Sequence, residues 1–315
     1  MTFVVDWALA PTPSLTVVTE EVMEDVQPML GPGSVCVTVT GAVVVSEPRA
    51  DRLRWTEPDG RSFLIGAVPG LTDGTPWEAR FRHPLGVAAA PDGSVVAADT
   101  DNHAIRLIGP DGWVTTVAGG AYGAVDAQGL EARFRHPQGV AVAPDGTVFV
   151  ADTVSNTVRR VDADGTVTTL AGGPYGQGDL QAGEISLRRP EAVAVGPDGT
   201  VYVADTGNDR VVGIGPSGQA RTVAGRRSLG SAPAPAPDLR WPTSLALAGD
   251  GTLYITDAAS NVVRRASRDG TSTTFAREPG WRPVALSLFP DGRVLVAEAR
   301  WAPGRTTGRL RTIDP

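Results

Sequence analysis

The sequence of 315 residues contains no lysine; all 28 of its basic residues are arginine. This absence excludes a lysine Schiff base and a lysine general base, so anions must be held by guanidinium groups or backbone amides. Cysteine is almost absent as well. The single Cys36 excludes an intrachain disulfide framework, and its place in an apolar run predicts a buried apolar side chain rather than a nucleophile.

Membrane spans and cofactor motifs are also missing. No apolar run is long enough to cross a bilayer. The first residues have no basic start and carry Asp6 inside their only apolar run, which argues against a signal peptide and for a cytoplasmic location. There is no phosphate-binding glycine loop, nucleophile elbow, HExxH motif or EF-hand loop, so we expect no cofactor. A net charge of −7 argues against a nucleic-acid partner.

What the sequence does contain is a repeat. Three strong copies start at residues 83, 136 and 189, and the copy over 136–172 reads HPQGVAVAPDGTVFVADTVSNTVRRVDADGTVTTLAG. Weaker copies start at 241 and 282, and a divergent copy starts at 31. A unit of this kind cannot bury its apolar faces alone and must stack on copies of itself.

Each copy holds runs of β-forming residues divided by turn signals. In the copy at 136 we expect strands at 139–143, 147–151, 157–161 and 166–170. The sixth copy lacks its fourth run, whereas an orphan apolar run at 15–19 precedes the first copy. We therefore predict an all-β, six-bladed β-propeller of four-stranded antiparallel blades, one domain over 1–315. Strand 15–19 would complete the last blade and protect the sheet edges.

Strand direction sorts the connections onto two faces. The short PDG-type turns share one face, which we call the bottom, and hardly vary between copies. The loops after each second strand and the crossings between blades share the top face and vary most. Function usually resides on variable loops held by a rigid scaffold, so we expect the site at the top. Only five residues separate the fifth and sixth copies, which predicts a low rim there.

The copies resemble NHL repeats. The resemblance lies in RFRHPLGV (80–87) with VAADTDN (96–102), in RFRHPQGV (133–140) with VFVADTVSN (148–156), and in VYVADTGN (201–208). The crossing at 70–81 is similar to those of bacterial proteins that fuse a thioredoxin domain to an NHL propeller. This chain has no CxxC motif, so their redox function is not implied. The family includes enzymes and protein- or RNA-binding modules, so the resemblance implies a fold rather than an activity.

Related propellers hold metals in the pore, and the resemblance does not extend to those sites. The histidines that bind zinc in peptidyl-hydroxyglycine lyases correspond to positions where this chain has Leu85, Gln138, Glu191, Thr243 and Val284. Of the Glu/Asn/Asp set that holds a divalent cation in gluconolactonase-like propellers, only Glu191 is matched. His83 and His136 occupy equivalent places in adjacent copies, but the next equivalent residue is Arg189, so we expect no metal.

The residues that open the copies are expected to ring the upper mouth of the pore. The residue before the proline is, in chain order, Gly31, His83, His136, Arg189, Trp241 and Arg282, and the residue before that is Leu30, Arg82, Arg135, Arg188, Arg240 and Trp281. Such a cationic, aromatic mouth suits an anionic, partly planar small molecule. Alternatively, these arginines pair with the acids that end each second strand, namely Glu47, Asp99, Asp152, Asp205, Asp257 and Glu298. Those acids recur in every copy and are expected to be structural.

Differences between the copies give the candidate catalytic residues. Glu191 is the only acid at its repeat position and would point toward the pore, where burial would raise its pKa and suit it to act as a general base. Arg189 would hold a carboxylate or an oxyanion, and His136 would shuttle a proton. The alternative for Glu191 is a simple salt bridge to Arg189 or Arg188. Candidate ligand-binding residues are His83, Gln138, Trp241, Arg282, Arg135, Tyr122 and Tyr175, whereas His103 is expected to be structural.

Two functions follow from this mouth. The first is a cytoplasmic enzyme or binder that acts on an anionic small molecule without a cofactor, by lyase, cyclase, isomerase or lactone-hydrolase chemistry. The second is a non-catalytic scaffold that binds a protein partner on the same face through aromatic residues such as Trp77, Trp241 and Trp281. The sequence favours the first only narrowly.

Overall fold

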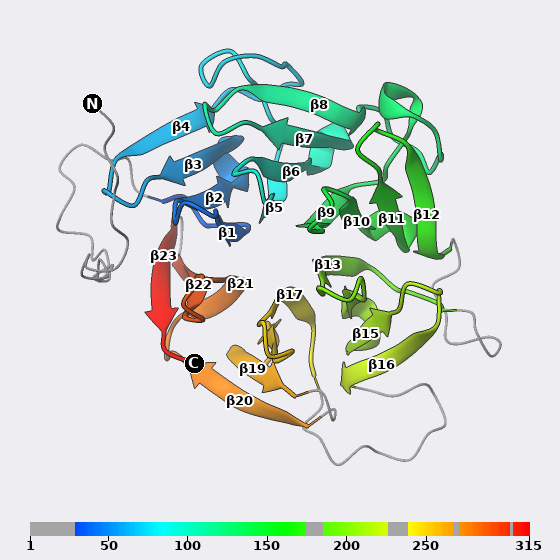
Figure 1. Ribbon diagram of the computed structural model, residues 1–315. Helices are drawn as coiled ribbons and strands as arrows, with labels where there is room; N and C mark the ends of the chain where they lie inside the picture. Colours follow the sequence, from blue (N-terminus) through cyan, green and yellow to red (C-terminus); the bar gives the residue numbers. More distant parts are fainter. Residues whose placement is uncertain (1–28, 174–184, 226–238, 268–270, 303–304) are drawn as a thin grey trace, which may run out of the picture.

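The computed structural model describes residues 29–173, 185–225, 239–267, 271–302 and 305–315. Six antiparallel sheets surround a central axis, and each sheet is one blade (Figure 1). Blades 1 to 3 comprise β1 (Val35–Val37), β2 (Val43–Glu47), β3 (Arg52–Thr56) and β4 (Ser62–Gly66); β5 (Pro84–Ala89), β6 (Val95–Asp99), β7 (Ala104–Ile108) and β8 (Val114–Gly119); and β9 (Pro137–Val142), β10 (Val148–Asp152), β11 (Thr157–Val161) and β12 (Val167–Gly172). Blades 4 to 6 comprise β13 (Pro190–Val195), β14 (Val201–Asp205), β15 (Arg210–Ile214) and β16 (Ala220–Gly225); β17 (Pro242–Leu247), β18 (Leu253–Asp257), β19 (Val262–Ala266) and β20 (Ser272–Arg277); and β21 (Arg282–Leu288), β22 (Val294–Ala302) and β23 (Arg305–Ile313).

The predicted six-bladed propeller is confirmed. Its innermost strands are β1, β5, β9, β13, β17 and β21, and each contacts the innermost strands of both neighbouring blades, including β1 against β21 where the ring closes. Blade 6 has three strands among the described residues. The strand predicted at 15–19 lies outside the described residues, so completion of blade 6 by that segment stays a prediction, as does the single domain over 1–315.

The apolar core lies between blades rather than within one. Val96 and Ala98 of blade 2, for example, belong to one buried cluster with Val148 and Val150 of blade 3. Alternating side chains of one strand point to opposite faces of its sheet, so every blade shares a core with the blade on each side. This packing explains why the inner strands read as almost continuous Val and Ala runs.

The top loop of blades 2 to 4 has a repeated structure that joins neighbouring blades. In blade 3 the second strand is followed by a 3-10 turn, Thr153–Ser155, which ends at Asn156 in the left-handed conformation. Asn156 Oδ1 accepts a hydrogen bond of 2.9 Å from the backbone N–H of Arg189, and Thr153 Oγ1 donates one of 2.7 Å to the carbonyl of Pro190. The loop of one blade therefore fixes the start of the next blade.

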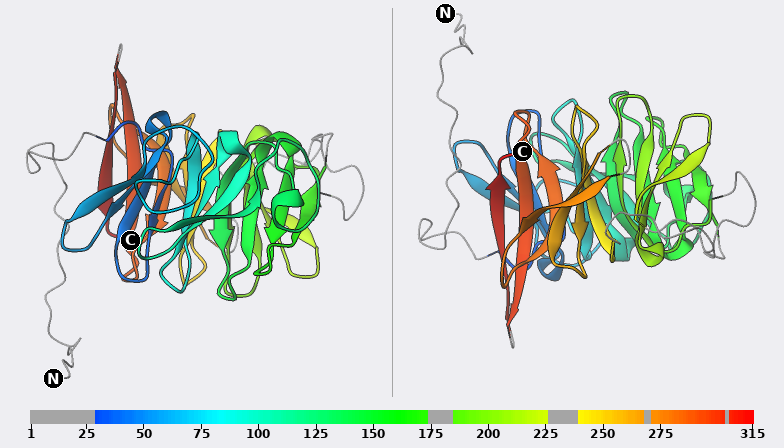
Figure 2. Two further views of the ribbon diagram at one scale, coloured as in Figure 1. Left: turned by 90° about the horizontal axis from the view of Figure 1, so that it is seen from above. Right: turned by 90° about the horizontal axis from the view of Figure 1, so that it is seen from below.

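Blade 6 differs from this pattern. Its β22 and β23 continue to pair over nine residues, from Val294↔Ile313 to Ala302↔Arg305, where blades 2 to 4 turn after five. The hairpin projects beyond the disc at the end away from the bottom turn (orange and red, Figure 2). The hairpin therefore raises the rim at blade 6 (Figure 2), whereas the low rim predicted at the crossing between the fifth and sixth copies stays a prediction.

The described helices are all 3-10 turns of three residues. None of these described helices is therefore long or apolar enough to cross a membrane.

Close approach of adjacent inner strands explains one glycine and gives a stability prediction. A Cβ added to Gly139 in β9 would lie 2.6 Å from the Cα of Ala192 and from the carbonyl oxygen of Glu191 in β13. We expect Gly139→Ala to lower the free energy of unfolding by about 1–3 kcal/mol, because the two backbones must separate. Gly249→Ala is the control, since nothing lies within 4 Å of its added Cβ. Urea denaturation of both variants measures the difference, and equal stabilities would contradict the expected strain.

Candidate functional site

The rim of the pore is built from strained backbone. Gly31, His83, His136, Arg189 and Trp241 all have φ between 47° and 61°, in the left-handed region. For a residue with a side chain this conformation costs about 1–2 kcal/mol. Arg282, the sixth residue of this set, is not among the residues with positive φ and starts β21 instead.

Hydrogen bonds from the preceding blade hold the strained rim residues. The N–H groups of His83, Arg189 and Trp241 donate to side-chain oxygens of Asp51, Asn156 and Asp209 over 2.7, 2.9 and 2.9 Å. The N–H of His136 instead donates to Nδ1 of His103 over 3.4 Å. Because the same contact recurs in four blades, the strain at the rim is architectural.

The six acids that end the second strands are structural, but their charged partners are not those that the sequence suggested. All six carboxylates are buried, and their guanidinium partners lie mainly on the third strands: Arg52 and Arg54 with Glu47, Arg106 with Asp99, Arg159 with Asp152, Arg210 with Asp205, Arg264 with Asp257, and Arg309 and Arg311 with Glu298. The rim arginines Arg82, Arg135, Arg188 and Arg240 approach these acids through their backbone N–H groups. Burial raises the pKa of Asp99 to about 6 in spite of its hydrogen bonds and of the Arg106 charge.

A cavity of about 350 Å³ occupies the centre of the ring and is lined by the inner strands of all six blades. Its upper ring takes one residue from each blade: Gly33, Leu85, Gln138, Glu191, Thr243 and Val284. Its lower ring, two residues further along each strand, is Val35, Val87, Val140, Val193, Leu245 and Leu286, and all six are buried. The cavity therefore has a mixed upper layer above an apolar floor.

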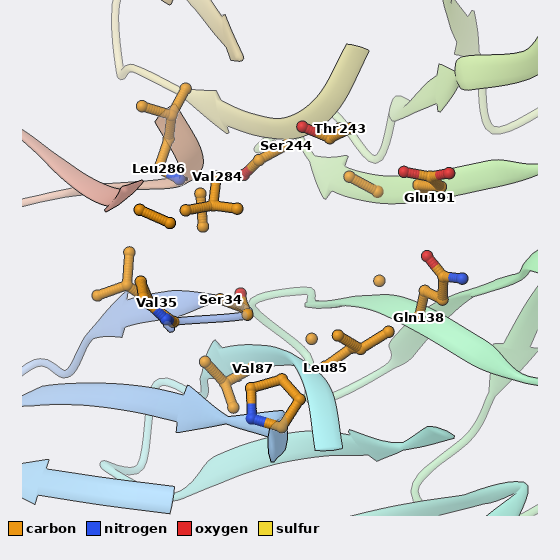
Figure 3. A pocket seen from close by; sticks show the side chains of 18 of the residues that line it. Ser34, Val35, Leu85, Val87, Gln138, Glu191, Thr243, Ser244, Val284 and Leu286 are labelled. Atoms are coloured by element: carbon orange, nitrogen blue, oxygen red, sulfur yellow. Dashed lines mark hydrogen bonds between the residues drawn. The ribbon is translucent and has the colours of Figure 1, made fainter. Parts of the chain in front are cut away.

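The upper ring is polar on one side only. Gln138, Glu191 and Thr243 come from the adjacent blades 3, 4 and 5, whereas Val284 and Leu85 come from blades 6 and 2 on either side of Gly33 (Figure 3). At the level of the upper ring, a ligand would meet hydrogen-bonding groups from blades 3 to 5 and apolar side chains from blades 6 and 2.

Glu191 is the one carboxylate among the described residues that line the cavity. Its side chain is only 13% exposed, and its Oε1 lies 3.7 Å from the Arg189 guanidinium, which is 59% exposed. Burial raises the pKa of Glu191, while the charge of Arg189, a hydrogen bond with the Trp241 side chain and the charge of Arg282 act in the opposite direction. The predicted salt bridge to Arg189 is therefore present. A largely buried carboxylate with a raised pKa can remove a proton, and the role of Glu191 as a base stays a prediction.

His136 is placed differently from Glu191. It is not among the residues that line the cavity. Its Nδ1 lies 3.2 Å from Oδ1 of Asp101, and its ring contacts those of His103 and Tyr122 at centroid distances of 4.6 and 6.1 Å. The guanidinium of Arg135 lies 5.6 Å from the Tyr122 ring. His136, Arg135 and Tyr122 thus form a separate cluster on the rim between blades 2 and 3.

The remaining candidates divide between the cavity and the rim. His83, Gln138 and Arg282 line the cavity, whereas Trp241 reaches it through its contact with Glu191. Tyr175 lies outside the described residues. Arg49 and Trp301 also line the cavity and were missed by the sequence reasoning. Arg49 lies in the 3-10 turn of the divergent first copy, where the strong copies have Asp101, Val154 and Gly207. Trp301 lies in the extension of β22, which has no counterpart in the strong copies.

Comparison with known proteins identifies the family. The model of the NHL repeat matches residues 81–106, 134–160 and 187–214. The chain is 31% identical over 212 residues to virginiamycin B lyase of Nocardia farcinica, and the match covers 58% of this chain and 72% of the lyase. The chain belongs to the NHL-repeat β-propeller family.

Other similarities fit an NHL propeller used in different settings. The chain is 30% identical over 159 residues to Protein SUPPRESSOR OF QUENCHING 1 of Arabidopsis thaliana and 25% identical over 301 residues to Teneurin-3 of Danio rerio, covering 46% and 81% of this chain. It spans only 15% and 10% of the lengths of these two relatives.

Solved structures of similar fold include two with enzyme names. A streptogramin B lyase matches with a TM-score of 0.61 and 14% identity over 92% of this chain and 85% of that one. A putative gluconolactonase matches with a TM-score of 0.58 and 17% identity over 91% of this chain and 90% of that one. At these identities the likeness shows the fold alone.

Two further observations on this NHL propeller concern metal binding and its single thiol. Within the described part of the chain, no group of three His, Cys, Asp or Glu side chains is arranged to hold a metal ion. Cys36 is buried, as predicted, and burial raises the pKa of its thiol far above the usual range. A neutral buried thiol is a poor nucleophile.

The His103 contact predicts a pH effect on stability. His103 Nδ1 accepts a hydrogen bond and must be unprotonated, and burial and the charge of His136 lower its pKa. Below about pH 6.5 the unfolded chain then binds more protons at this site than the native state, so stability falls as the pH drops toward the lower folded pKa. His103→Asn supplies an acceptor at every pH, as Asn156 does, and should remove this loss. Urea denaturation of the variant and the wild type at pH 7.5 and 5.5 tests this prediction. The same pH dependence of the free energy of unfolding in both proteins would contradict it.

Proposed function

We propose that this propeller is an enzyme that binds an anionic small molecule at the upper mouth of its pore and removes a proton from it with Glu191. The observation that carries the proposal is the position of Glu191: the one carboxylate among the described cavity residues is largely buried, has a raised pKa and lies beside arginine. A base in this environment binds a proton more readily than a free carboxylate does, while Arg189 and Trp241 favour its ionised form.

The neighbouring residues support charge stabilisation rather than a proton relay. Arg189 is close enough to Glu191 to stabilise negative charge that develops on a bound substrate. His136 contacts Asp101 and His103 instead of the cavity, so the proposal assigns proton removal to Glu191 and leaves His136 a positioning role at the rim.

Elimination or lactone opening fits this arrangement best. In elimination, Glu191 takes the proton from a carbon next to a carbonyl group, the C–H electrons form a C=C bond, and the adjacent C–O bond breaks with its electrons on the leaving oxygen. In lactone hydrolysis, Glu191 instead takes a proton from water as the water oxygen attacks the carbonyl carbon. The ring C–O bond then breaks with its electrons on the ring oxygen, which receives the proton from Glu191. Family relatives named virginiamycin B lyase and the fold neighbour named putative gluconolactonase support these two classes.

A turnover assay in oxygen-labelled water tests the proposal and separates the two reactions. The purified protein is incubated with virginiamycin B, quinupristin and gluconolactone, and the products are read by mass spectrometry. Elimination gives product without the label, whereas hydrolysis adds one labelled oxygen. Turnover that depends on Glu191 supports the proposal, and turnover unaffected by Glu191→Gln would overturn it.

The raised pKa of Glu191 predicts the pH profile of that activity. Because the base must be deprotonated, kcat/KM should rise with pH, with a midpoint above the ordinary value of 4.5 for glutamate. Arg189→Gln removes the nearest positive charge, which holds this pKa down, so the midpoint should move to higher pH. An unchanged or lower midpoint in this variant would show that another group titrates.

A second candidate function is a scaffold that binds a protein partner, and exposed tryptophan favours it. Trp77 is 81% exposed and Trp241 is 48% exposed, and tryptophan is the residue most enriched at binding hot spots. Capture of a partner that is lost with Trp241→Ala, without any turnover, would select this function. Trp281 is a weaker anchor, because the Arg309 guanidinium already lies 4.2 Å from its ring centre.

A further inference from the structure

The charges of the cavity are separated across the pore. Glu191 comes from blade 4, whereas the three basic residues that line the cavity, Arg49, His83 and Arg282, come from blades 1, 2 and 6. Blades 6, 1 and 2 are consecutive in the ring where it closes, opposite blade 4 (Figure 1). The cavity therefore has a basic side, while its one described carboxylate lies on blade 4, near enough to Arg282 for that charge to lower the pKa of Glu191.

The basic side is held in place without a carboxylate. Among the described residues, none of these three basic side chains forms an ion pair with an acid. The Arg282 guanidinium lies 5.4 Å from the ring centre of Trp301, and its buried Nε has no hydrogen-bond partner within the described structure. Arg49 Nη1 donates to Thr306 Oγ1 over 2.6 Å. A stacked guanidinium that lacks an acid is preorganised to bind an anion through two parallel hydrogen bonds.

Apolar surface lies directly below this basic side. At blade 1 the upper ring has no side chain, because Gly33 occupies that position. A larger residue would clash there, since an added Cβ would lie 2.6 Å from Pro48 Cγ. Leu85 and Val284 come from the blades on either side, and the six residues of the lower ring are apolar, while Ser34 adds a hydroxyl group to the lining at blade 1 (Figure 3). The apolar part of a ligand whose anionic group binds Arg282 would therefore contact Leu85 or Val284 above the lower ring.

We propose that the ligand is an amphipathic anion with a carboxylate or phosphate group on Arg282, supported by Arg49 and His83. Its apolar part lies along Leu85 and Val284, and a C–H or carbonyl group away from the anionic end faces Glu191. This inference rests on the proposed function for the role of Glu191, but the anion subsite itself does not require catalysis. It moves the anion-binding role from Arg189, which the sequence suggested, to the opposite side of the pore.

Calorimetric titration with small probes tests the subsite. Hexanoate and hexyl phosphate carry the two anionic groups on one apolar chain; acetate lacks the chain, and hexylammonium reverses the charge. We expect hexanoate or hexyl phosphate to bind, acetate to bind more weakly, and hexylammonium not to bind. The stronger of the two anions identifies the head group. Equal binding of hexylammonium, or no binding of either six-carbon anion, would overturn the proposal.

Variants of two arginines on the same blade assign the site. Arg282→Gln should weaken binding of the preferred anion about tenfold or more, as expected for loss of one charge-assisted pair. Arg300→Gln removes an equal charge from the exposed face of β22 and should leave affinity unchanged. Arg282→Lys keeps the charge but loses the planar group that stacks on Trp301, so it should give an intermediate loss of anion affinity. Circular dichroism checks that all three variants are folded. Equal affinities for Arg282→Gln and Arg300→Gln would refute the assignment.

Glu191→Gln separates this proposal from the catalytic one. It removes a negative charge from the cavity, so anion affinity should be kept or increased while turnover is lost. Anion binding that depends on Arg282 in a protein without any turnover would sustain the subsite and reject the catalysis. Turnover that depends on Glu191 with anion binding insensitive to Arg282 would do the opposite.

Discussion

Glu191→Gln is expected to lower kcat/KM by about 10²- to 10⁴-fold, the range typical of a lost general base. Glutamine has nearly the same shape and can still accept a hydrogen bond from Trp241, so the cavity should be preserved while proton removal is lost. Steady-state kinetics on the substrate found in the turnover assay measures the effect. Loss of a catalytic proton acceptor should appear mainly in kcat.

Glu131→Gln is the matched control for this substitution. Glu131 is exposed in a 3-10 turn of a crossing and does not line the cavity. It loses the same charge, so a shared effect of the two variants would indicate a change in overall electrostatics rather than in the reaction. A drop in kcat confined to Glu191→Gln supports the base, whereas a change confined to KM would show that Glu191 only binds.

Arg159→Met is expected to lower the free energy of unfolding by about 3–5 kcal/mol, because it leaves a buried carboxylate without its positive partner. Arg159 is 1% exposed and pairs with Asp152 at 3.3 Å and with Asp126. It also donates to the carbonyls of Arg133 and Val125. One side chain therefore ties the crossing into blade 3 to the second and third strands.

Arg160→Met provides the comparison, because the next residue along β11 also pairs with an acid but at the surface. Arg160 is 48% exposed and lies 2.7 Å from Asp162, so its loss should cost no more than about 1 kcal/mol. Burial already raises the pKa of Asp152, and removal of Arg159 should raise it further. The loss in free energy of unfolding caused by Arg159→Met should thus become smaller as the pH falls and Asp152 takes up a proton. Equal losses in free energy of unfolding for the two variants, measured by urea denaturation, would contradict this account.

The fold could be predicted because its information is local and repeated. In the copy at 136 the third strand was predicted at 157–161 and lies at Thr157–Val161, and the other strands differ by one or two residues at their ends. Each differing end falls at a β-bulge or a turn; the register between β9 and β10, for example, shifts between Ala151 and Asp152. The PDG turns and the alternating apolar residues of each copy were sufficient for the rest.

The site was less predictable because it depends on differences between copies. Equivalent positions predicted that Gln138 and Glu191 lie at one level of the pore and that Arg282 lies on the rim above it, and these three residues do line one cavity. The same logic grouped His136 with them, but the left-handed backbone and the His103 contact place its ring beside Asp101. Arg49 replaces the Asp101, Val154 and Gly207 of the strong copies, so their pattern gives no sign of a basic residue there, and Trp301 lies in the extension of β22, which the strong copies lack.

The construction of the upper ring bears on how such a protein diverges. Each blade contributes one residue to it, and Leu85, Gln138, Glu191, Thr243 and Val284 all lie outside the buried apolar clusters that join neighbouring blades. Substitutions there change what the cavity accepts with little effect on the cores that stabilise the blades. A lineage can therefore change the chemistry of its cavity one codon at a time without altering the apolar cores between blades, and a saturation library at these five codons would sample the same route in the laboratory.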